Sequence, residues 1–208
     1  MQDYIDKISD FEFEMLQSVQ GTNGRASCQD NPKTFKLMRK AQFLTWNKDI
    51  LASYYKDLVE AKKIGRNLLG EKFAFMMEST HPYEFASMKD ALPILSLEFI
   101  QNREAIIEIY MQWEQSLLDN YPYVKSQGRP SFSHDDRLKG TSIETYLRGE
   151  FSTYSLETLS LILLHVQKCF EEKRNLGEEN LYIMMLDYGF SSIQDAEDWA
   201  RSKTSKII

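Results

Sequence analysis

Apolar residues recur at spacings of three and four along most of this chain, and no stretch alternates strictly between apolar and polar positions. The first pattern gathers apolar side chains on one face of an α-helix, whereas strict alternation would indicate a β-strand. The pattern therefore predicts an all-α fold of about seven to nine helices, two of them long and central.

Glycines, prolines and capping residues divide this pattern into segments. The expected helices cover residues 3–19, 32–64, 68–79, 96–120, 142–148, 156–174 and 178–188, with a last helix beginning at 192. The long central helices are 32–64 and 96–120. At the start of the last helix, Ser192 and Asp195 have the spacing of a capping box. Residues 21–31, 87–93 and 121–141 are expected to be loops or irregular segments.

No internal repeat, low-complexity stretch or linker divides the chain. A domain of 208 residues buries roughly 70% of its unfolded surface, so it can form a core without disulfides or metals. We therefore expect one compact helical domain over residues 1–208. Within it, an amino-terminal helix and loop (1–31) precede the main helical body (32–208). Apolar positions on the first helix could pack within the domain or on a second copy of the chain. The sequence therefore does not decide whether the chain forms a homo-oligomer.

The charge balance narrows the choice of partners. The chain has 25 Lys and Arg against 31 Asp and Glu, a formal net charge of −6, whereas nucleic-acid-binding domains usually carry a basic face. No apolar run approaches the about 20 residues needed to span a bilayer. Nucleic-acid and membrane partners are therefore not expected.

The cysteines and the first residues bear on location. The first ten residues contain Asp3, Asp6 and Asp10 and no apolar stretch, so a signal peptide is not expected. Cys28 and Cys169 are far apart in the sequence, and two such cysteines in a chain without an export signal usually stay reduced. The predicted location is cytoplasmic.

Motifs for metals, cofactors or a nucleophile are weak or missing. The single Glu-x-x-His spacing of the kind found in di-metal helical proteins is Glu78 to His81, where Pro82 ends the helix. Clustered Cys and His residues for zinc are absent, as is the Gly-x-Ser-x-Gly nucleophile motif. We expect neither a metal nor a cofactor.

A first group of polar residues lies at the junction of two helices. Arg66 and Asn67 follow a glycine at the start of a helix, where unsatisfied backbone amides and the helix dipole favour an anion, and Glu71 lies one turn later. The alternative is a tight corner in which Arg66 caps a neighbouring helix and Asn67 caps its own.

A second group follows the long loop. Tyr146, Arg148, Glu150 and Tyr154 lie within eleven residues, just before the most apolar helix. A buried Arg–Glu pair beside tyrosine hydroxyls could hold a carboxylate or a phosphate, because arginine binds both in a bidentate way. It could equally be an internal ion pair that closes a corner.

Arg129 contributes a third arginine from the loop over residues 121–141. Long loops in compact domains are often lids or binding loops. The alternative is a solvated loop with no partner. We expect a lid that is anchored near Tyr121 and Asp136 and covers a cavity formed by residues 65–72 and 145–155. In that cavity, Arg66 and Arg148 would each face a carboxylate of Glu71 or Glu150.

Several polar motifs occur in an order that resembles one known family. They include Gly65-Arg-Asn67, Glu71-Lys72, Tyr121-Pro122, Gly128-Arg-Pro130, Ser142-Ile-Glu-Thr-Tyr-Leu-Arg-Gly-Glu150 and Thr153-Tyr-Ser155. Over nearly the whole chain, the sequence is similar to the uncharacterised prokaryotic domain-of-unknown-function family 4125. The resemblance implies no activity, substrate or cofactor.

Two classes of function fit these observations, and whether the chain is an enzyme stays open. In the first, the chain binds a small anionic molecule in a pocket formed by Arg66, Asn67, Glu71, Arg129, Tyr146, Arg148, Glu150 and Tyr154. In the second, it is a protein–protein interaction module without catalytic activity, which would expose an apolar patch on its outside.

Overall fold

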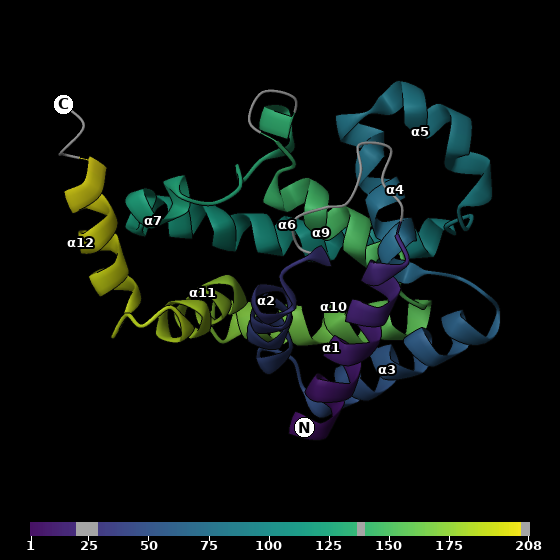
Figure 1. The fold of residues 1–208 in the computed structure, drawn as a ribbon, viewed down its shortest axis with the longest axis horizontal. Coiled ribbons are helices and arrows are strands. Elements are labelled where there is room, and N and C mark those ends of the chain that lie inside the picture. Colours follow the sequence, from purple (N-terminus) through teal and green to yellow (C-terminus); the bar gives the residue numbers. More distant parts are fainter. Residues whose placement is uncertain (20–28, 137–139, 205–208) are drawn as a thin grey trace.

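Helices make up most of the structure, a computed structural model that describes residues 1–19, 29–136 and 140–204 (Figure 1). These residues form eleven α-helices, joined by short loops and 3-10 turns, and none of them lies in a strand. The predicted all-α fold is confirmed, although the helices outnumber the about seven to nine expected from periodicity. Among the described residues, no helix has both the length and the apolar character needed to cross a bilayer.

The helix bounds follow the chain order. The first six helices are α1 (Gln2–Gln17), α2 (Pro32–Leu44), α3 (Lys48–Lys63), α4 (Leu68–Thr80), α5 (Pro82–Met88) and α6 (Leu97–Asn120). The remaining five are α7 (Pro122–Ser126), α9 (Ile143–Phe151), α10 (Leu156–Glu171), α11 (Leu176–Asp187) and α12 (Ile193–Thr204). Most of the predicted loop over residues 21–31, with Cys28, lies outside the described residues, as do residues 137–139.

The single long helix predicted over residues 32–64 is wrong, because the chain turns between α2 and α3. Asn47 has an extended backbone, and its side chain accepts hydrogen bonds from the amides two and three residues further on, which caps α3. The preceding Trp46 is buried in the turn, so the apolar period continues through the break. The other long helix, over 96–120, is confirmed as α6.

Two short helices lie where the sequence predicts none. α5 ends inside the segment predicted to be irregular, and α7 lies inside the predicted loop over residues 121–141. Each begins with a proline, Pro82 or Pro122, whose fixed backbone angle suits the first helical position. Helices of seven and five residues are too short to show a periodic pattern.

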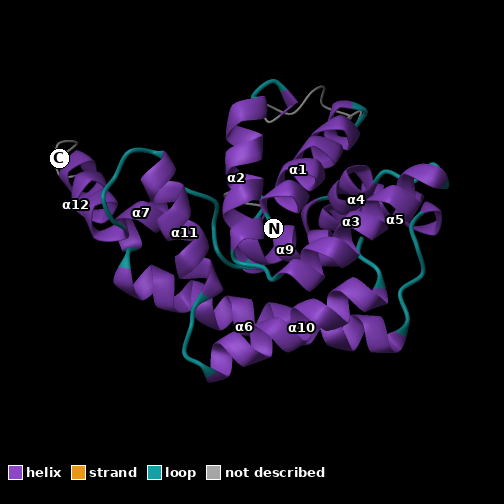
Figure 2. Cartoon of the chain, turned by 90° about the horizontal axis from the view of Figure 1, so that it is seen from below, coloured by secondary structure: helices purple, strands orange, loops and turns teal. Residues whose placement is uncertain are grey.

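The main hydrophobic core lies between two groups of helices. α6 and α10 pack side by side, and α3 and α9 pack onto this pair (Figure 2). α1 contacts α2, α3 and α4, which completes the covering layer. The fully buried side chains at the centre of this core include Ile8, Phe43, Leu51, Leu58, Ile106, Phe151 and Leu159.

A second, smaller hydrophobic cluster lies at the carboxyl-terminal end. Its buried members Met185, Ile193 and Ala196 come from α11 and α12, and side chains next to and within α7 pack against them. α12 packs mainly on α7 and α11, while α11 also packs on α2 and α6 of the main body. The end of the molecule that carries α12 is therefore joined to the main core through α6 and α11. The organisation as one domain stays a prediction.

Candidate ligand-binding site

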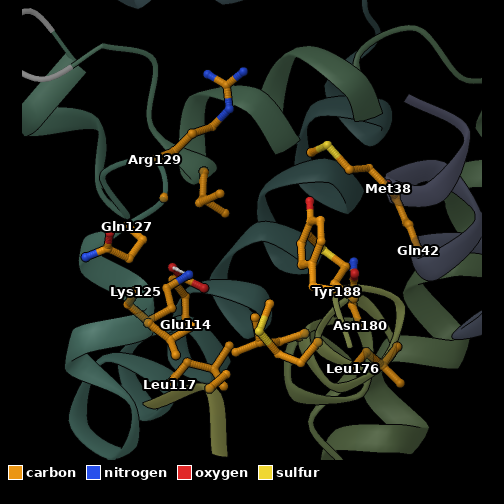
Figure 3. A pocket seen from close by; sticks show the side chains of 18 of the residues that line it. Met38, Gln42, Glu114, Leu117, Lys125, Gln127, Arg129, Leu176, Asn180 and Tyr188 are labelled. Atoms are coloured by element: carbon orange, nitrogen blue, oxygen red, sulfur yellow. Dashed lines mark ion pairs between the residues drawn. The ribbon is translucent and has the colours of Figure 1, made fainter. Parts of the chain in front are cut away.

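A cavity of about 500 Å³ separates the two hydrophobic clusters. Its wall is formed by side chains from α2, α6 and α9 of the main body and from α7, α11 and α12 of the carboxyl-terminal end (Figure 3). Cavities of this size in proteins typically hold small molecules. The six helices are far apart in the sequence, so the cavity depends on the tertiary fold.

Most of the cavity wall is apolar. This apolar wall consists mainly of Met38, Tyr110, Leu117, Ile143, Leu147, Leu176, Leu181, Met184, Met185, Phe190 and Trp199. Three of these side chains are methionines, which are flexible and adapt to irregular shapes. The wall therefore favours a ligand with a substantial apolar body.

Arg129 provides a charged group at one end of the cavity. It lies at the opposite end from Leu117 and Leu176 (Figure 3). Its Nη1 donates to the carbonyl oxygen of Thr141 at 3.2 Å, and its guanidinium lies 5.4 Å from the ring centre of Tyr146. Among the described residues, no carboxylate pairs with Arg129. Its remaining donors can therefore meet an acidic group of a ligand.

Glu114 and Lys125 form a second polar feature of the wall. Their side chains are nearly buried, and the Lys125 Nζ lies 2.5 Å from the Glu114 Oε1 (Figure 3). The Ser131 hydroxyl also donates to this carboxylate oxygen, at 2.7 Å. The pair joins α6 to α7 and carries no net charge, so it supplies little attraction for an ion.

Arg39, a third cation on the wall, belongs to a buried charge network formed by Glu12, Arg39, Lys72 and Glu150. Arg39 donates to both oxygens of Glu12 at 2.6 Å, and its Nη1 lies 3.0 Å from a Glu150 oxygen. The Lys72 Nζ lies 2.5 Å from the other Glu150 oxygen. The network therefore contains two positive and two negative groups, which come from α1, α2, α4 and α9.

The positive charges and hydrogen bonds of the buried charge network keep Glu150 ionised. Burial alone would raise the pKa of Glu150, but the charges of Arg39 and Lys72 and their hydrogen bonds outweigh it and hold that pKa well below its usual range. The Tyr154 hydroxyl donates to Glu150 at 2.6 Å, and the Tyr54 hydroxyl donates to a carboxylate of the same network. Burial and these carboxylates raise the pKa of both tyrosines, which keeps them as donors.

The buried charge network also fixes part of the cavity wall. The Lys72 Nζ lies 3.5 Å from the ring centre of Tyr146, a cation–π contact on the ring that also faces Arg129. Gln42, a lining residue, donates to Glu150 at 2.8 Å. The network thus orients three lining side chains, Arg39, Gln42 and Tyr146, before any ligand arrives.

The first predicted group of site residues closes a helix corner. Arg66 pairs with Glu71 through two hydrogen bonds of 2.8 and 2.6 Å, which confirms the predicted partner. Asn67 caps its own helix by accepting from the amide of Gly70 at 2.9 Å, and its side-chain amide donates to the backbone of α1. The Asn67 cap agrees with the alternative that the sequence left open, whereas the Arg66 side chain pairs with Glu71 instead of capping a neighbouring helix. Arg66 does not line the cavity.

The predicted pairing of Arg148 with Glu150 is wrong. Arg148 instead binds Glu104 at 2.6 Å and Glu144 at 3.0 Å, outside the cavity. Residues two apart on a helix point about 200° away from each other, so Arg148 and Glu150 face different neighbours.

Of the three arginines predicted to form one pocket, only Arg129 lines the cavity, so the three do not form one pocket. Tyr146 lines the cavity. Glu150, a member of the buried charge network, and Tyr154, which donates to Glu150, lie outside the lining.

The anchors predicted for the loop over residues 121–141 are present. Asp136 is buried and accepts hydrogen bonds from the Thr145 hydroxyl, the Ser142 amide and the Ser79 hydroxyl. Burial would raise the pKa of Asp136, but these hydrogen bonds outweigh it and lower that pKa. At the other end, the Tyr121 hydroxyl donates to a carboxylate of α11 at 3.2 Å.

Sequence reasoning missed most of the charged residues that shape this site, although a signal was present. Glu12, Arg39 and Lys72 each lie on the apolar face of a helix, with a buried apolar residue four positions before and four positions after. The triplets are Ile8-Glu12-Leu16, Phe35-Arg39-Phe43 and Leu68-Lys72-Met76. A charge in such a position must find a buried partner, so these triplets could have indicated the network.

Comparisons with other proteins place the chain in a family without assigning it an activity. Within the described residues, no group of three or more His, Cys, Asp and Glu side chains is arranged to hold a metal ion. No curated protein and no solved structure shows significant similarity to the chain. The family model described as "Protein of unknown function (DUF4125)" matches residues 2–198, which is nearly the entire chain. This is the same family that the polar motifs resemble. The chain belongs to this family of proteins of unknown function.

Proposed function

We propose that this protein binds a small molecule with an acidic group and an apolar body in the cavity between its two hydrophobic clusters. One observation carries this proposal: an apolar cavity of about 500 Å³ has, at one end, an arginine that no described carboxylate pairs with. We further propose that the protein acts in the cytoplasm, a compartment in which cysteines stay reduced.

The chemistry of Arg129 supports an acidic group in the ligand. A guanidinium presents five donors in a planar fork that matches the two oxygens of a carboxylate. One donor is used by the Thr141 carbonyl, and the adjacent Tyr146 ring limits the movement of the side chain. Arg129 is exposed, so an acid bound there would keep part of its hydration.

A second candidate function, docking of a protein partner, rests on the segment from α5 to the start of α6. Tyr83 is 91% exposed, Ile94 100% and Leu97 72%, and no residue between positions 81 and 98 is buried. Apolar side chains that gather on an exposed segment often mark interaction surfaces. If this surface carries the function, Ile94→Ser would abolish partner binding and leave small-molecule binding unchanged.

Trp199 offers a direct test of ligand binding. It lines the cavity and is 50% exposed, whereas Trp46 and Trp113 are buried. A ligand in the cavity should displace water from Trp199, shift its emission to shorter wavelength and raise the melting temperature. We expect a screen of small organic acids to yield such ligands, and Trp199→Phe should remove the fluorescence change but keep the thermal shift.

Substitution of Arg129 then tests the site itself. Arg129→Gln should weaken binding of an acidic ligand at least tenfold, about 1.4 kcal/mol, and change stability by less than about 0.5 kcal/mol. The matched control is Lys40→Gln, which removes an exposed cation from α2 outside the cavity lining. If no compound shifts Trp199, or if both variants bind equally well, the proposal is wrong.

A further inference from the structure

We infer that the ligand is a monocarboxylate with an unbranched or weakly branched apolar body, such as a medium-chain aliphatic acid. This inference rests on the proposed function. It specifies how many negative charges the ligand carries, which acidic group bears the charge and what kind of apolar body the ligand has. Two independent features of the cavity carry it, namely the charge balance of its wall and the chemistry of its interior.

The charge balance of the wall leaves one positive charge for a ligand. The buried charge network has two cations and two anions, held together by distances of 2.5 to 3.1 Å. Glu114 and Lys125 neutralise each other at 2.5 Å. Among the described residues of the wall and their direct partners, Arg129 is then the cation that has no anion to balance it.

A single unbalanced guanidinium selects a single negative charge. A carboxylate meets its two parallel N–H groups in a bidentate pair and neutralises it. A phosphate monoester carries close to two negative charges at neutral pH, and the wall offers no second unbalanced cation among its described residues for the second charge. A neutral alcohol of the same length would leave the Arg129 charge without a counter-ion and would gain only the apolar contacts.

The interior of the cavity selects the rest of the molecule. Leu117 and Leu176 lie at the end of the cavity opposite to Arg129 (Figure 3), and the methionines of α11, Met184 and Met185, also line it. Methionine and leucine side chains adjust to a flexible aliphatic chain and offer no hydrogen bonds to a polar one. The affinity should therefore grow with the length of the chain until the cavity is filled.

Calorimetric titration of the full chain with a set of related compounds tests this inference. The set comprises acetate, hexanoate, octanoate, decanoate, decanol and decyl phosphate, each below its aggregation concentration. From hexanoate to decanoate, the affinity should rise up to about fourfold per added methylene, the gain expected when a CH₂ group is buried. Decanoate should bind at least tenfold more tightly than decanol or decyl phosphate, and acetate should show no binding.

Two variants locate the two ends of the ligand. Arg129→Gln should reduce the affinity for decanoate to that for decanol, whereas Lys40→Gln should leave it unchanged. Met38→Gln alters a lining residue that is 42% exposed and should reduce the gain in affinity per methylene without disturbing the fold. A folded Met38→Gln variant is identified by an unchanged circular dichroism spectrum.

Several results would overturn the inference. Equal binding of decanol and decanoate would show that the site does not require a carboxylate. Tighter binding of decyl phosphate than of decanoate would show that the site does not select a single negative charge. Tighter binding of a peptide with an apolar carboxyl terminus would assign the site to a protein partner. If none of these compounds binds while the screen with Trp199 finds another ligand, the inference fails and the proposed function stands. If that screen also fails, both are wrong.

Discussion

At the residue scale, this protein holds charges inside its core where apolar residues would ordinarily lie. Glu12, Arg39 and Lys72 occupy the centres of apolar helix faces, and each is almost completely buried. Buried ion pairs are seldom more stable than apolar packing of the same volume, but the loss of one partner leaves an uncompensated charge. The network is therefore sensitive to single substitutions and sets the orientation of the Tyr146 ring at the cavity.

Glu150→Gln tests this sensitivity. Glu150 has two cationic partners and two neutral donors, so its loss should reduce the free energy of unfolding by about 3–5 kcal/mol at pH 7. The measurement is urea unfolding followed by circular dichroism. The control is Glu157→Gln, which breaks an exposed pair with Lys56 and should change stability by less than about 1 kcal/mol.

The same variant should change the response to acid. The folded pKa of Glu150 is lower than its unfolded value of about 4.3, so its contribution is complete above that pH and is lost as the pH falls toward the folded pKa. Below about pH 4, the wild type should therefore lose stability faster than Glu150→Gln, and the difference between them should narrow. Parallel pH profiles would show that Glu150 is not the ionised centre of the network.

At the element scale, the sequence predicted where most helices lie but not how they meet. Helical periodicity identified α4, α6, α10 and α11 because each is long enough to show a repeat. It joined α2 to α3, since the buried Trp46 continues the apolar pattern through the turn and the cap at Asn47 was not recognised. Pairing between helices depends on the shapes of their surfaces, which a single sequence does not display. The predicted partner of Arg148, Glu150, therefore differs from its observed partners, Glu104 and Glu144.

Gly149 illustrates such a shape. A Cβ atom at this position would lie 2.6 Å from the Met76 Cγ and 2.8 Å from the Lys72 carbonyl oxygen, because α9 and α4 approach each other closely there. Gly149→Ala should therefore destabilise the protein by about 1–3 kcal/mol despite the better helix propensity of alanine. Thermal unfolding measures this effect.

Gly70→Ala is the matched control. It lies in the helix that faces Gly149, but a Cβ atom there would meet its nearest neighbour at 3.6 Å, an ordinary contact distance. This variant should be neutral or more stable, by up to about 1 kcal/mol. If both variants are equally stable, the close approach of α4 and α9 does not constrain Gly149.

At the scale of the whole molecule, the cavity exists because a small cluster of helices rests against a larger one. Its lining runs from Met38 on α2 to Ala200 on α12, so no local sequence motif could have revealed it. The sequence did predict the loop that carries Arg129 and its two anchors, since length, glycines and prolines are local properties. It could not predict that Arg66 and Arg148 stay outside the cavity, because that depends on how α4 and α9 are placed and rotated about their axes.

Glu197 is the residue that fastens the outer wall of the cavity. It is buried on α12, and its two carboxylate oxygens accept hydrogen bonds from the amides of Tyr123 and Val124 at 3.0 and 2.7 Å, at the start of α7. Glu197→Ala should cost about 2 kcal/mol of local stability, because hydrogen bonds to charged groups are lost. Amide hydrogen exchange should then accelerate in α7 and α12 and stay unchanged in α6 and α10.

The same substitution connects this fastening to ligand binding. If α12 forms part of the binding wall, Glu197→Ala should weaken the binding of an acid such as decanoate severalfold, although the substituted residue does not line the cavity. Asp198→Ala, at an exposed position on the same helix, should affect neither exchange nor binding. Faster exchange throughout the main core would contradict this view, since the two clusters would then unfold as one unit and α12 would not act as a separate wall.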